Sequence, residues 1–177
     1  MTKTLKILFV ILAITIFGGE TFFYYQIKKQ SQESDIKTLR WKTYQNERYG
    51  FIIKYPKSWK IEEIQEEIFS VGFTSPEMSE KIEKGVPDAG AEITLSIEKN
   101  SNNLTLDQFI ENYAGGREMV LSKSSITIGD IPGFKCILNG MVPLTDYFWA
   151  RDSQVFILDA FSEEDIQSEM LSTFKFI

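Results

Sequence analysis

The sequence of 177 residues contains no histidine and only one cysteine, Cys136. The absence of histidine excludes a Ser-His-Asp triad, a Cys-His nucleophile pair, a histidine general base and any zinc site that needs histidine. A single cysteine excludes an intrachain disulfide and a cysteine-rich metal site. With these enzyme classes removed, a non-enzymatic protein without a cofactor is expected.

Positive charge is scarce over most of the chain. Residues 1–43 carry seven basic and three acidic side chains, a charge of +4, whereas residues 44–177 carry twelve basic and 22 acidic side chains, a charge of −10. Nucleic acid binding needs a basic surface, so no nucleic acid partner is expected. The apolar content of 43% is that of a folded chain, and the length allows one ordinary domain with a tail.

The N-terminal residues hold a long apolar run. Two lysines precede an uncharged stretch from Ile7 to Gly19, which is the layout of a secretory signal. Cleavage after Gly19 would place Phe17 where a small residue is needed, so the run is expected to stay attached. Extended to Tyr25, it has about the length of a membrane span, with Tyr24 and Tyr25 at the interface. Residues 1–25 are therefore predicted to be a signal anchor.

The orientation of this anchor depends on two signals that disagree. Two basic residues precede it and five follow closely, which by the positive-inside rule places the C-terminal side in the cytoplasm. The short N-terminus and the signal-like layout favour export instead. We expect a single-pass protein of the cell membrane whose globular domain is extracytoplasmic. Polar residues 26–43 are predicted as a juxtamembrane linker and residues 44–177 as one globular domain.

Short strands and two helices are predicted in that domain. Ile93, Leu95 and Ile97 alternate with polar residues, the pattern of a half-buried strand. Thr105 and Gln108 form a capping box at the start of a helix. Further predictions are strands at 49–56, 59–61 and 69–74, a polar loop at 75–90, hairpins at 125–139 and 146–161, and a helix capped by Ser162. This order predicts an α+β fold with an antiparallel sheet.

Several short motifs follow one another along the domain. They are Tyr49-Gly50-Phe51 leading to Tyr55-Pro56 and Trp59, the stretches 73–76, 105–109 and 128–133, and a terminal Thr-Phe-Lys-Phe at 173–176. Their order resembles the PsbP/Mog1-like family, especially bacterial PsbP-related proteins behind a signal or anchor. The resemblance implies an α/β/α sandwich around a central antiparallel sheet. It also implies a non-enzymatic scaffold that binds a partner.

The densest group of acids is Glu62, Glu63, Glu66 and Glu67. On a helix these residues would form two stacked carboxylate pairs, and oxygen ligands suit Ca²⁺ or Mg²⁺. The spacing matches no calcium loop, so a solvated acidic edge is the main interpretation, with the four glutamates as the metal candidates.

Aspartates near aromatic strands supply the enzyme alternative. Two carboxylates at a suitable separation can perform acid/base hydrolysis. Asp152 is better explained by a turn, and Asp159 stands out within an apolar strand. Nothing in the sequence places Asp146 and Asp159 together. A carboxylate enzyme predicts that two acids converge in a deep pocket with shifted pKa values, and the candidates are Asp146, Asp159 and Glu92.

Aromatic residues and arginines supply the candidate partner contacts. Arg151 follows Tyr147 and Trp149, and Arg117 is another of the few arginines of the domain. Tyr, Trp and Arg carry much of the energy of protein interfaces. The alternative is that Trp149 lies in the core and Arg151 pairs with Asp152.

Together these features predict an anchored, exported accessory module for an envelope or membrane protein complex. Two alternatives stay open, an extrinsic subunit like those of the photosystem II oxygen-evolving complex and a tethered domain that binds a small ligand or metal. The predicted anchor and the missing histidines weigh against the photosynthetic role.

Overall fold

A computed structural model describes residues 41–160 and 164–177. The strands are β1 (Trp41–Asn46), β2 (Phe51–Pro56), β3 (Lys60–Gln65), β4 (Phe69–Thr74), β5 (Ile93–Lys99), β6 (Val120–Ile128), β7 (Ile131–Leu138), β8 (Leu144–Arg151), β9 (Gln154–Ala160) and β10 (Lys175–Phe176). The helices are α2 (Pro76–Glu83), α3 (Leu106–Ala114), the short 3₁₀ helix η1 (Arg117–Met119) and α4 (Glu164–Ser172). The predicted anchor at 1–25, the linker up to residue 40 and the Ser162 cap lie outside the described residues. Within the described ranges, no helix is long and apolar enough to cross a membrane.

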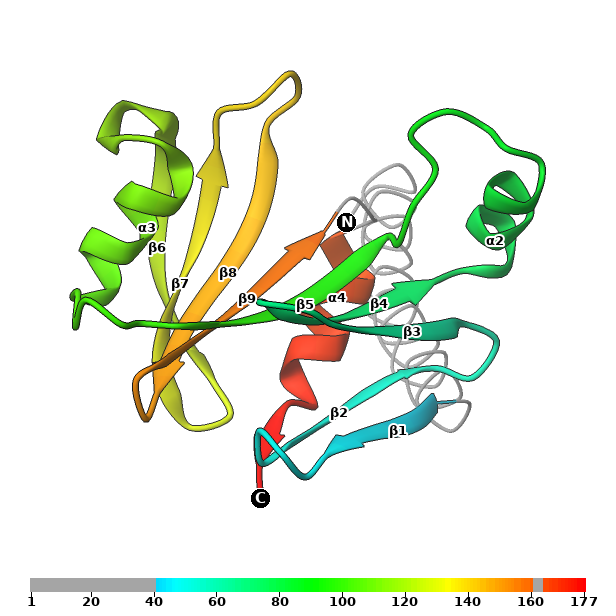
Figure 1. The fold of residues 1–177 in the computed structure, drawn as a ribbon, viewed down its shortest axis with the longest axis horizontal. Helices are drawn as coiled ribbons and strands as arrows, with labels where there is room; N and C mark the ends of the chain where they lie inside the picture. Colours follow the sequence, from blue (N-terminus) through cyan, green and yellow to red (C-terminus); the bar gives the residue numbers. More distant parts are fainter. Residues whose placement is uncertain (1–40, 161–163) are drawn as a thin grey trace, which may run out of the picture. The chain divides into compact units, whose positions relative to one another are not determined.

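The described strands form two sheets (Figure 1). Seven of them make a large sheet in the order β3-β4-β5-β9-β8-β7-β6, and the pairings between its neighbours are antiparallel. The other three make a small sheet in the order β1-β2-β10. The predicted central antiparallel sheet is therefore confirmed.

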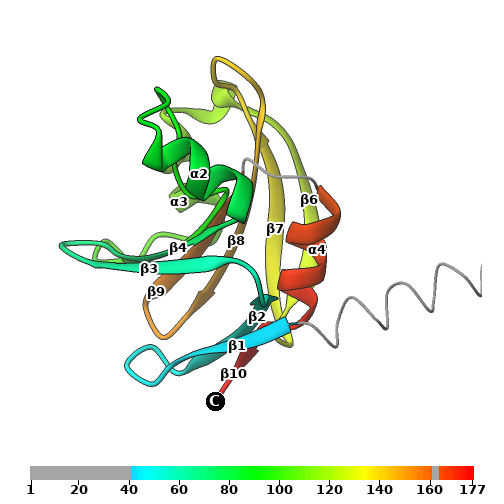
Figure 2. The same ribbon diagram turned by 90° about the vertical axis from the view of Figure 1, so that its right-hand side faces the viewer.

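The two faces of the large sheet are covered by different parts of the chain. Phe148 and Trp149 are neighbours on β8, so their side chains point to opposite faces. Phe148 belongs to a buried cluster with Phe109 and Ile110 of α3. Trp149 contacts Phe174, which follows α4, with ring centroids 4.9 Å apart. Helix α3 therefore covers one face, and α4 with the C-terminal end covers the other, as Figure 2 shows.

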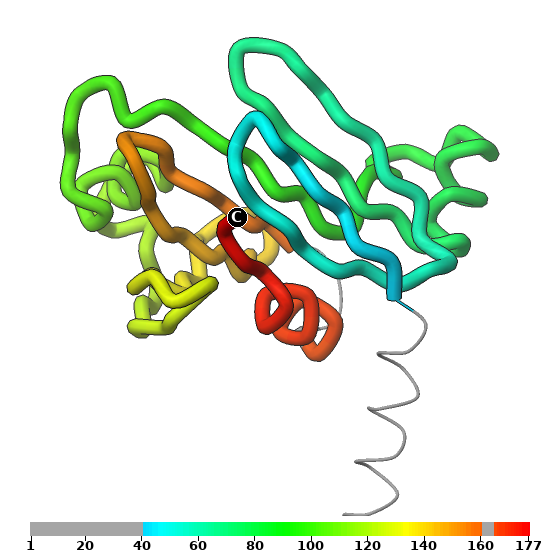
Figure 3. The backbone as a smooth tube through the Cα atoms, turned by 90° about the horizontal axis from the view of Figure 1, so that it is seen from below, coloured from blue at the N-terminus to red at the C-terminus, as the bar shows by residue number. Residues whose placement is uncertain are grey.

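Large aromatic side chains form the core between the large sheet and the C-terminal end. The Phe51 ring stacks on Phe174 at 5.4 Å, and Trp149 stacks on Phe156 at 5.6 Å. All four side chains are almost completely buried. The last strand then pairs with β2 and lies along it in Figure 3. Burial of these rings makes the main favourable contribution to the free energy that holds the small sheet in place, because removal of apolar surface from water dominates folding.

Both predicted hairpins are present, and each closes on a two-residue turn. The β6–β7 turn consists of Gly129 and Asp130, and the β8–β9 turn of Asp152 and Ser153. All four residues have positive φ, between 52° and 67°. Positive φ at both central residues matches the twist of paired strands, which is why such turns close hairpins. The turn interpretation of Asp152 is thus confirmed.

The helix predicted from the capping box is α3. The Thr105 side chain accepts a hydrogen bond from the backbone N–H of Gln108, and the Gln108 side chain accepts one from the backbone N–H of Thr105, at 3.3 and 3.0 Å. Gly115 ends the helix with a φ of 86°. Local sequence signals therefore determine both ends of α3, the helix that covers one face of the large sheet.

Two predictions about local structure were wrong. The expected loop at 75–90 contains α2, which begins with Ser75 as the N-cap and Pro76 in the first turn. These start signals outweighed the polar composition, and the Glu77–Lys81 pair at 2.9 Å supports the helix. The expected linker also ends early, since β1 begins at Trp41.

Candidate functional site

Two aspartates meet across the large sheet. Asp146 on β8 is the direct cross-strand partner of Asp159 on β9. Side chains at such positions lie roughly 4.5–5.5 Å apart at their Cβ atoms. Residues two apart on a strand share a face, and Phe148 and Ile157 both belong to the α3 cluster. Both carboxyl groups are therefore on the face that α3 covers.

Asp146 is an acid that has no hydrogen-bond or ion-pair partner in the part of the chain that the structure describes. It is only 3% exposed. Its side chain makes no hydrogen bond or ion pair among the described residues. Burial, and then the neighbouring Asp159, raises the pKa of Asp146 to about 7. An uncompensated carboxyl group in such a position lowers the stability of the fold at neutral pH.

Asp159 is tied to α3 by one hydrogen bond. The hydroxyl of Tyr113 donates to Oδ1 of Asp159 over 3.2 Å. Burial raises the pKa of Asp159 to about 6, the bond from Tyr113 opposes this rise, and the charge of Glu98 adds to it. Burial and the Asp159 charge raise the pKa of Tyr113 far above its usual range, so the phenol keeps its proton and acts as a donor. Burial also raises the pKa of Glu98.

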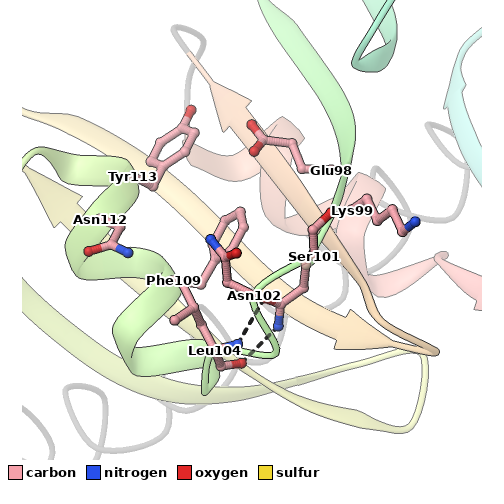
Figure 4. Close-up of a pocket in the computed structure, with 9 residues that line it drawn as sticks. Glu98, Lys99, Ser101, Asn102, Leu104, Phe109, Asn112 and Tyr113 are labelled. Carbon is pink, nitrogen blue, oxygen red and sulfur yellow. Dashed lines mark hydrogen bonds between the residues drawn. The ribbon is translucent and has the colours of Figure 1, made fainter.

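A pocket opens beside this cluster, between the end of β5 and α3. Its volume is about 310 Å³. Tyr113 and Glu98 stand at one end and Asn102 at the other, as Figure 4 shows. The loop that closes the pocket is held by Asn100, whose side chain donates to the carbonyl of Leu104 and accepts from its N–H at 2.8 and 2.9 Å. Because Tyr113 lines the pocket and bonds Asp159, it connects the pocket to the paired aspartates.

The surroundings of the pocket leave its negative charge largely uncompensated. In the described part of the chain, no ion pair involves Asp146, Asp159 or Glu98. Lys123 contacts Asp107 instead, and Lys99, which lines the pocket next to Glu98 in the sequence, is exposed. Such a site attracts cations and repels anions.

The enzyme alternative required two acids to converge in a deep pocket, and two of its three candidates do lie together. Asp146 and Asp159 are paired, but Glu92 accepts a hydrogen bond from the N–H of Ser75 at the start of α2, at 2.6 Å. Asp146 also does not line the pocket. The two paired carboxyl groups therefore do not face a common substrate space.

The statement that nothing in the sequence pairs these aspartates was wrong. The two-residue turn at Asp152 and Ser153 makes Arg151 face Gln154, and counting back along both strands pairs Asp146 with Asp159. Tyr113 and Glu98 were not singled out as site residues either. A hydroxyl-bearing aromatic on the apolar side of the helix was the one available signal for Tyr113.

The predicted partner contacts lie in different places. Trp149 is completely buried and Tyr147 is 3% exposed, so both are core residues, which corrects the expectation that they contact a partner. Arg151 pairs with Asp152 at 3.1 Å and lies over the Phe176 ring at 4.5 Å. Arg117 is exposed after α3, 3.9 Å from a carboxylate oxygen of Glu111. A binding role for the two arginines stays a prediction.

The four glutamates proposed as metal candidates lie on the hairpin formed by β3 and β4. Glu62 and Glu63 belong to β3, so they point to opposite faces, and Glu66 and Glu67 lie in the bend that follows. The stacked pairs expected on a helix are therefore not formed. Tyr44 donates its hydroxyl hydrogen bond to Glu63 at 2.8 Å. Within residues 41–160 and 164–177, no group of three or more acidic or sulfur ligands is arranged to hold a metal ion.

Comparison with known proteins supports the fold. No family model matches the sequence, and no curated protein matches it. The solution structure of cyanobacterial PsbP (CyanoP) from Synechocystis sp. PCC 6803 is similar with a TM-score of 0.50 at 12% identity, covering 78% of this chain and 93% of that one. A crystal structure from Bacteroides thetaiotaomicron is similar with a TM-score of 0.41 at 14% identity, covering 72% of this chain and 45% of that one. The chain has a PsbP-like fold, as the resemblance in its motifs implied.

Proposed function

We propose that this chain is a non-enzymatic accessory module of an envelope protein complex, anchored by residues 1–25 with its domain exported. The pocket between β5 and α3 receives a group from the protein partner. One observation carries this proposal, namely that the pocket lies beside two paired carboxyl groups, the buried Asp146 and the partly exposed Asp159, neither of which forms an ion pair among the described residues.

The energetic argument is that this arrangement is unfavourable for the isolated domain. Like charges directly opposite one another on paired strands destabilise a sheet, and buried charges normally have a partner. Groups that lower stability without any local compensation are typical of functional sites. A bound partner that supplies the missing charge would recover the lost stabilisation, which couples binding to the fold.

The PsbP-like fold is consistent with an accessory role, and the composition supports it. Without histidine, the chain lacks the side chain that most often serves as general base in nucleophilic catalysis. Asp146 does not line the pocket and is only 3% exposed. The domain is therefore better suited to hold a partner than to turn over a substrate.

In-cell photo-cross-linking tests the proposal. A photo-reactive amino acid replaces Ser101, which is exposed and lines the pocket. The matched control places the same group at Asp130, which is exposed in the β6–β7 turn. We expect a discrete adduct with one membrane or envelope protein from the Ser101 position only. Absence of an adduct at Ser101, or the same adducts at both positions, would contradict the proposal.

Cysteine labelling tests export. Ser101→Cys places a thiol on the exposed loop, whereas Cys136 is completely buried and burial raises its pKa to about 11. The unmodified chain is therefore an unreactive control. We expect a membrane-impermeant maleimide to label Ser101→Cys on intact cells. Labelling that requires lysis would reverse the assignment of the domain to the outside.

A further inference from the structure

The pocket presents acidic and phenolic oxygens at one end and aromatic surface on its wall. Glu98 enters from β5 and Tyr113 enters from α3 (Figure 4). The hydroxyl of Tyr113 is bonded to Asp159. Asp146 lies behind Asp159, only 3% exposed and without a hydrogen-bond partner among the described residues. The end of the pocket that Glu98 and Tyr113 line is therefore the end closest to the uncompensated charge.

The charge of this end decides which class of ligand fits it. An anion would be repelled by the carboxylates, and a neutral group would leave them uncompensated. A divalent metal ion needs several oxygen ligands in a tight cage, and the described residues offer no group of three suitable side chains. An organic cation remains, because it needs only one or two counter-charges and can use apolar contacts for the rest of its binding energy.

The walls of the pocket fit the carbon chain of such a cation. The rings of Phe109 and Tyr113 are nearly parallel, with centroids 6.5 Å apart, and both residues line the pocket. Aromatic rings attract cations and pack against methylene groups. Asn102 and Asn112 also line the pocket and supply amide oxygens as further acceptors. A volume of about 310 Å³ accommodates an extended chain of a few carbons.

We propose that this pocket binds an alkylammonium group, with Glu98 as the counter-charge that lines it and Phe109 and Tyr113 as its aromatic wall. Asp159 does not line the pocket, and its carboxylate acts from behind Tyr113, whose hydroxyl it binds. The proposal rests on the function proposed above, in which the pocket receives a group from a protein partner. That group is then a lysine side chain. Tyr113 is a positioning residue, since its hydroxyl orients the carboxyl group of Asp159.

Calorimetric titration of the full-length chain in detergent tests the ligand class. The probes are putrescine, a short peptide with one exposed lysine, the same peptide with that lysine acetylated, and butanediol as the neutral analogue of putrescine. We expect saturable binding of the two ammonium probes and none of the two neutral ones. Binding of the lysine peptide above that of putrescine would assign the group to a protein, and the reverse would assign it to a free amine. No saturable binding of either ammonium probe, or equal binding of the neutral probes, would overturn the inference.

Substitutions that remove one charge each locate the site. We expect Glu98→Gln to weaken ammonium binding by roughly tenfold or more, as for the loss of a charge-assisted hydrogen bond. Asp159→Asn, which removes a charge that does not line the pocket, is expected to weaken binding by less. Asp130→Asn removes the same charge from an exposed turn, where a φ of 67° suits asparagine, and is expected to bind like the unmodified chain. Glu98 is only partly buried, so its substitution is expected to fold even where Asp159→Asn does not. Unchanged affinity in Glu98→Gln would overturn the assignment of the site.

The pH dependence gives a second readout. The titratable and charged groups around the pocket are Glu98 and Lys99 of β5, Asp107, Glu111 and Tyr113 of α3, Lys123 of β6, Cys136 of β7, Asp146 of β8 and Asp159 of β9. Below the pKa of Asp159, about 6, its carboxyl group is protonated. We expect affinity to fall as the pH is lowered through this range. Affinity that does not change with pH would contradict the role of Asp159.

Failure of this inference is distinguishable from failure of the proposed function. A partner captured at Ser101 whose cross-linking is not competed by putrescine, together with no ammonium binding, would leave the accessory role intact and exclude the ammonium ligand. Ammonium binding without a captured protein would overturn the accessory role and support a free amine as ligand.

Discussion

Replacing Asp146 by asparagine is expected to stabilise the protein above neutral pH. Asparagine has nearly the same shape as aspartate but carries no charge. Asp146 is 3% exposed, lacks a cationic partner among the described residues and lies opposite Asp159. Removing its charge therefore removes a desolvation cost and a like-charge contact, and it breaks no hydrogen bond in the described part of the chain.

The size and sign of the effect follow from the pKa. The pKa of Asp146 is about 7 in the folded chain and 3.8 as its ordinary value. Because the folded state holds the proton more tightly, the contribution of Asp146 to stability is fully present below pH 3.8 and is lost as the pH rises to about 7. Each pKa unit corresponds to about 1.4 kcal/mol, which sets an upper value of roughly 4 kcal/mol. Because the neighbouring Asp159 shares the effect, we expect a gain of about 2–4 kcal/mol near pH 8 and almost none near pH 4.

Urea unfolding followed by tryptophan fluorescence measures this gain, since Trp149 is completely buried. The control is Asp130→Asn, which removes an exposed charge and should change the free energy of unfolding by less than about 0.5 kcal/mol. Equal stability of Asp146→Asn and the unmodified chain near pH 8 would refute the reasoning. A gain of the same size at both pH values would also refute it, because it would not come from ionisation.

Three further substitutions test other parts of the structure. Tyr113→Phe removes the hydrogen bond that lowers the pKa of Asp159, so carboxyl NMR should show this pKa moving above about 6; an unchanged titration would contradict the bond. Phe174→Ala, in the aromatic core, should lower the free energy of unfolding in urea by about 3–5 kcal/mol. A loss of less than about 1 kcal/mol would contradict the observed packing of Phe174. Thr105→Ala should cost about 1 kcal/mol through loss of the α3 cap, whereas Thr105→Ser should retain most of the stability.

Local signals in the sequence predicted most of the elements. The two-residue turns, the capping box and the alternation at residues 93–97 depend on neighbouring residues, and all three correspond to observed elements. Helix α2 was missed although Ser75 and Pro76 form a standard helix start, because the polar composition of the segment was given more weight. Both local signals were present in the sequence, and the helix-start residues should have been given more weight than the polar composition.

Assignments that depend on the environment of a side chain were less successful. Tyr147 and Trp149 have the residue types of a binding surface, but they face the core of the domain. The acidic cluster at residues 62–67 would form stacked pairs only on a helix, and it lies on an exposed edge strand and its bend. Residue type alone does not distinguish an aromatic that fills a core from one that contacts a partner, because both uses depend on the same apolar surface.

The sequence by itself determined the cross-strand pairing of Asp146 with Asp159, because the two-residue turn at Asp152 and Ser153 sets the register of the hairpin. Only the tertiary structure decided that Asp146 is buried, that Asp159 is partly covered, and that neither forms an ion pair within the described residues. That outcome requires α3 to pack over β8 and β9 and to bring Tyr113 to Asp159, a contact between residues 46 positions apart. The raised pKa values follow from removal of water by that packing, and such a long-range arrangement has no local signature in the chain.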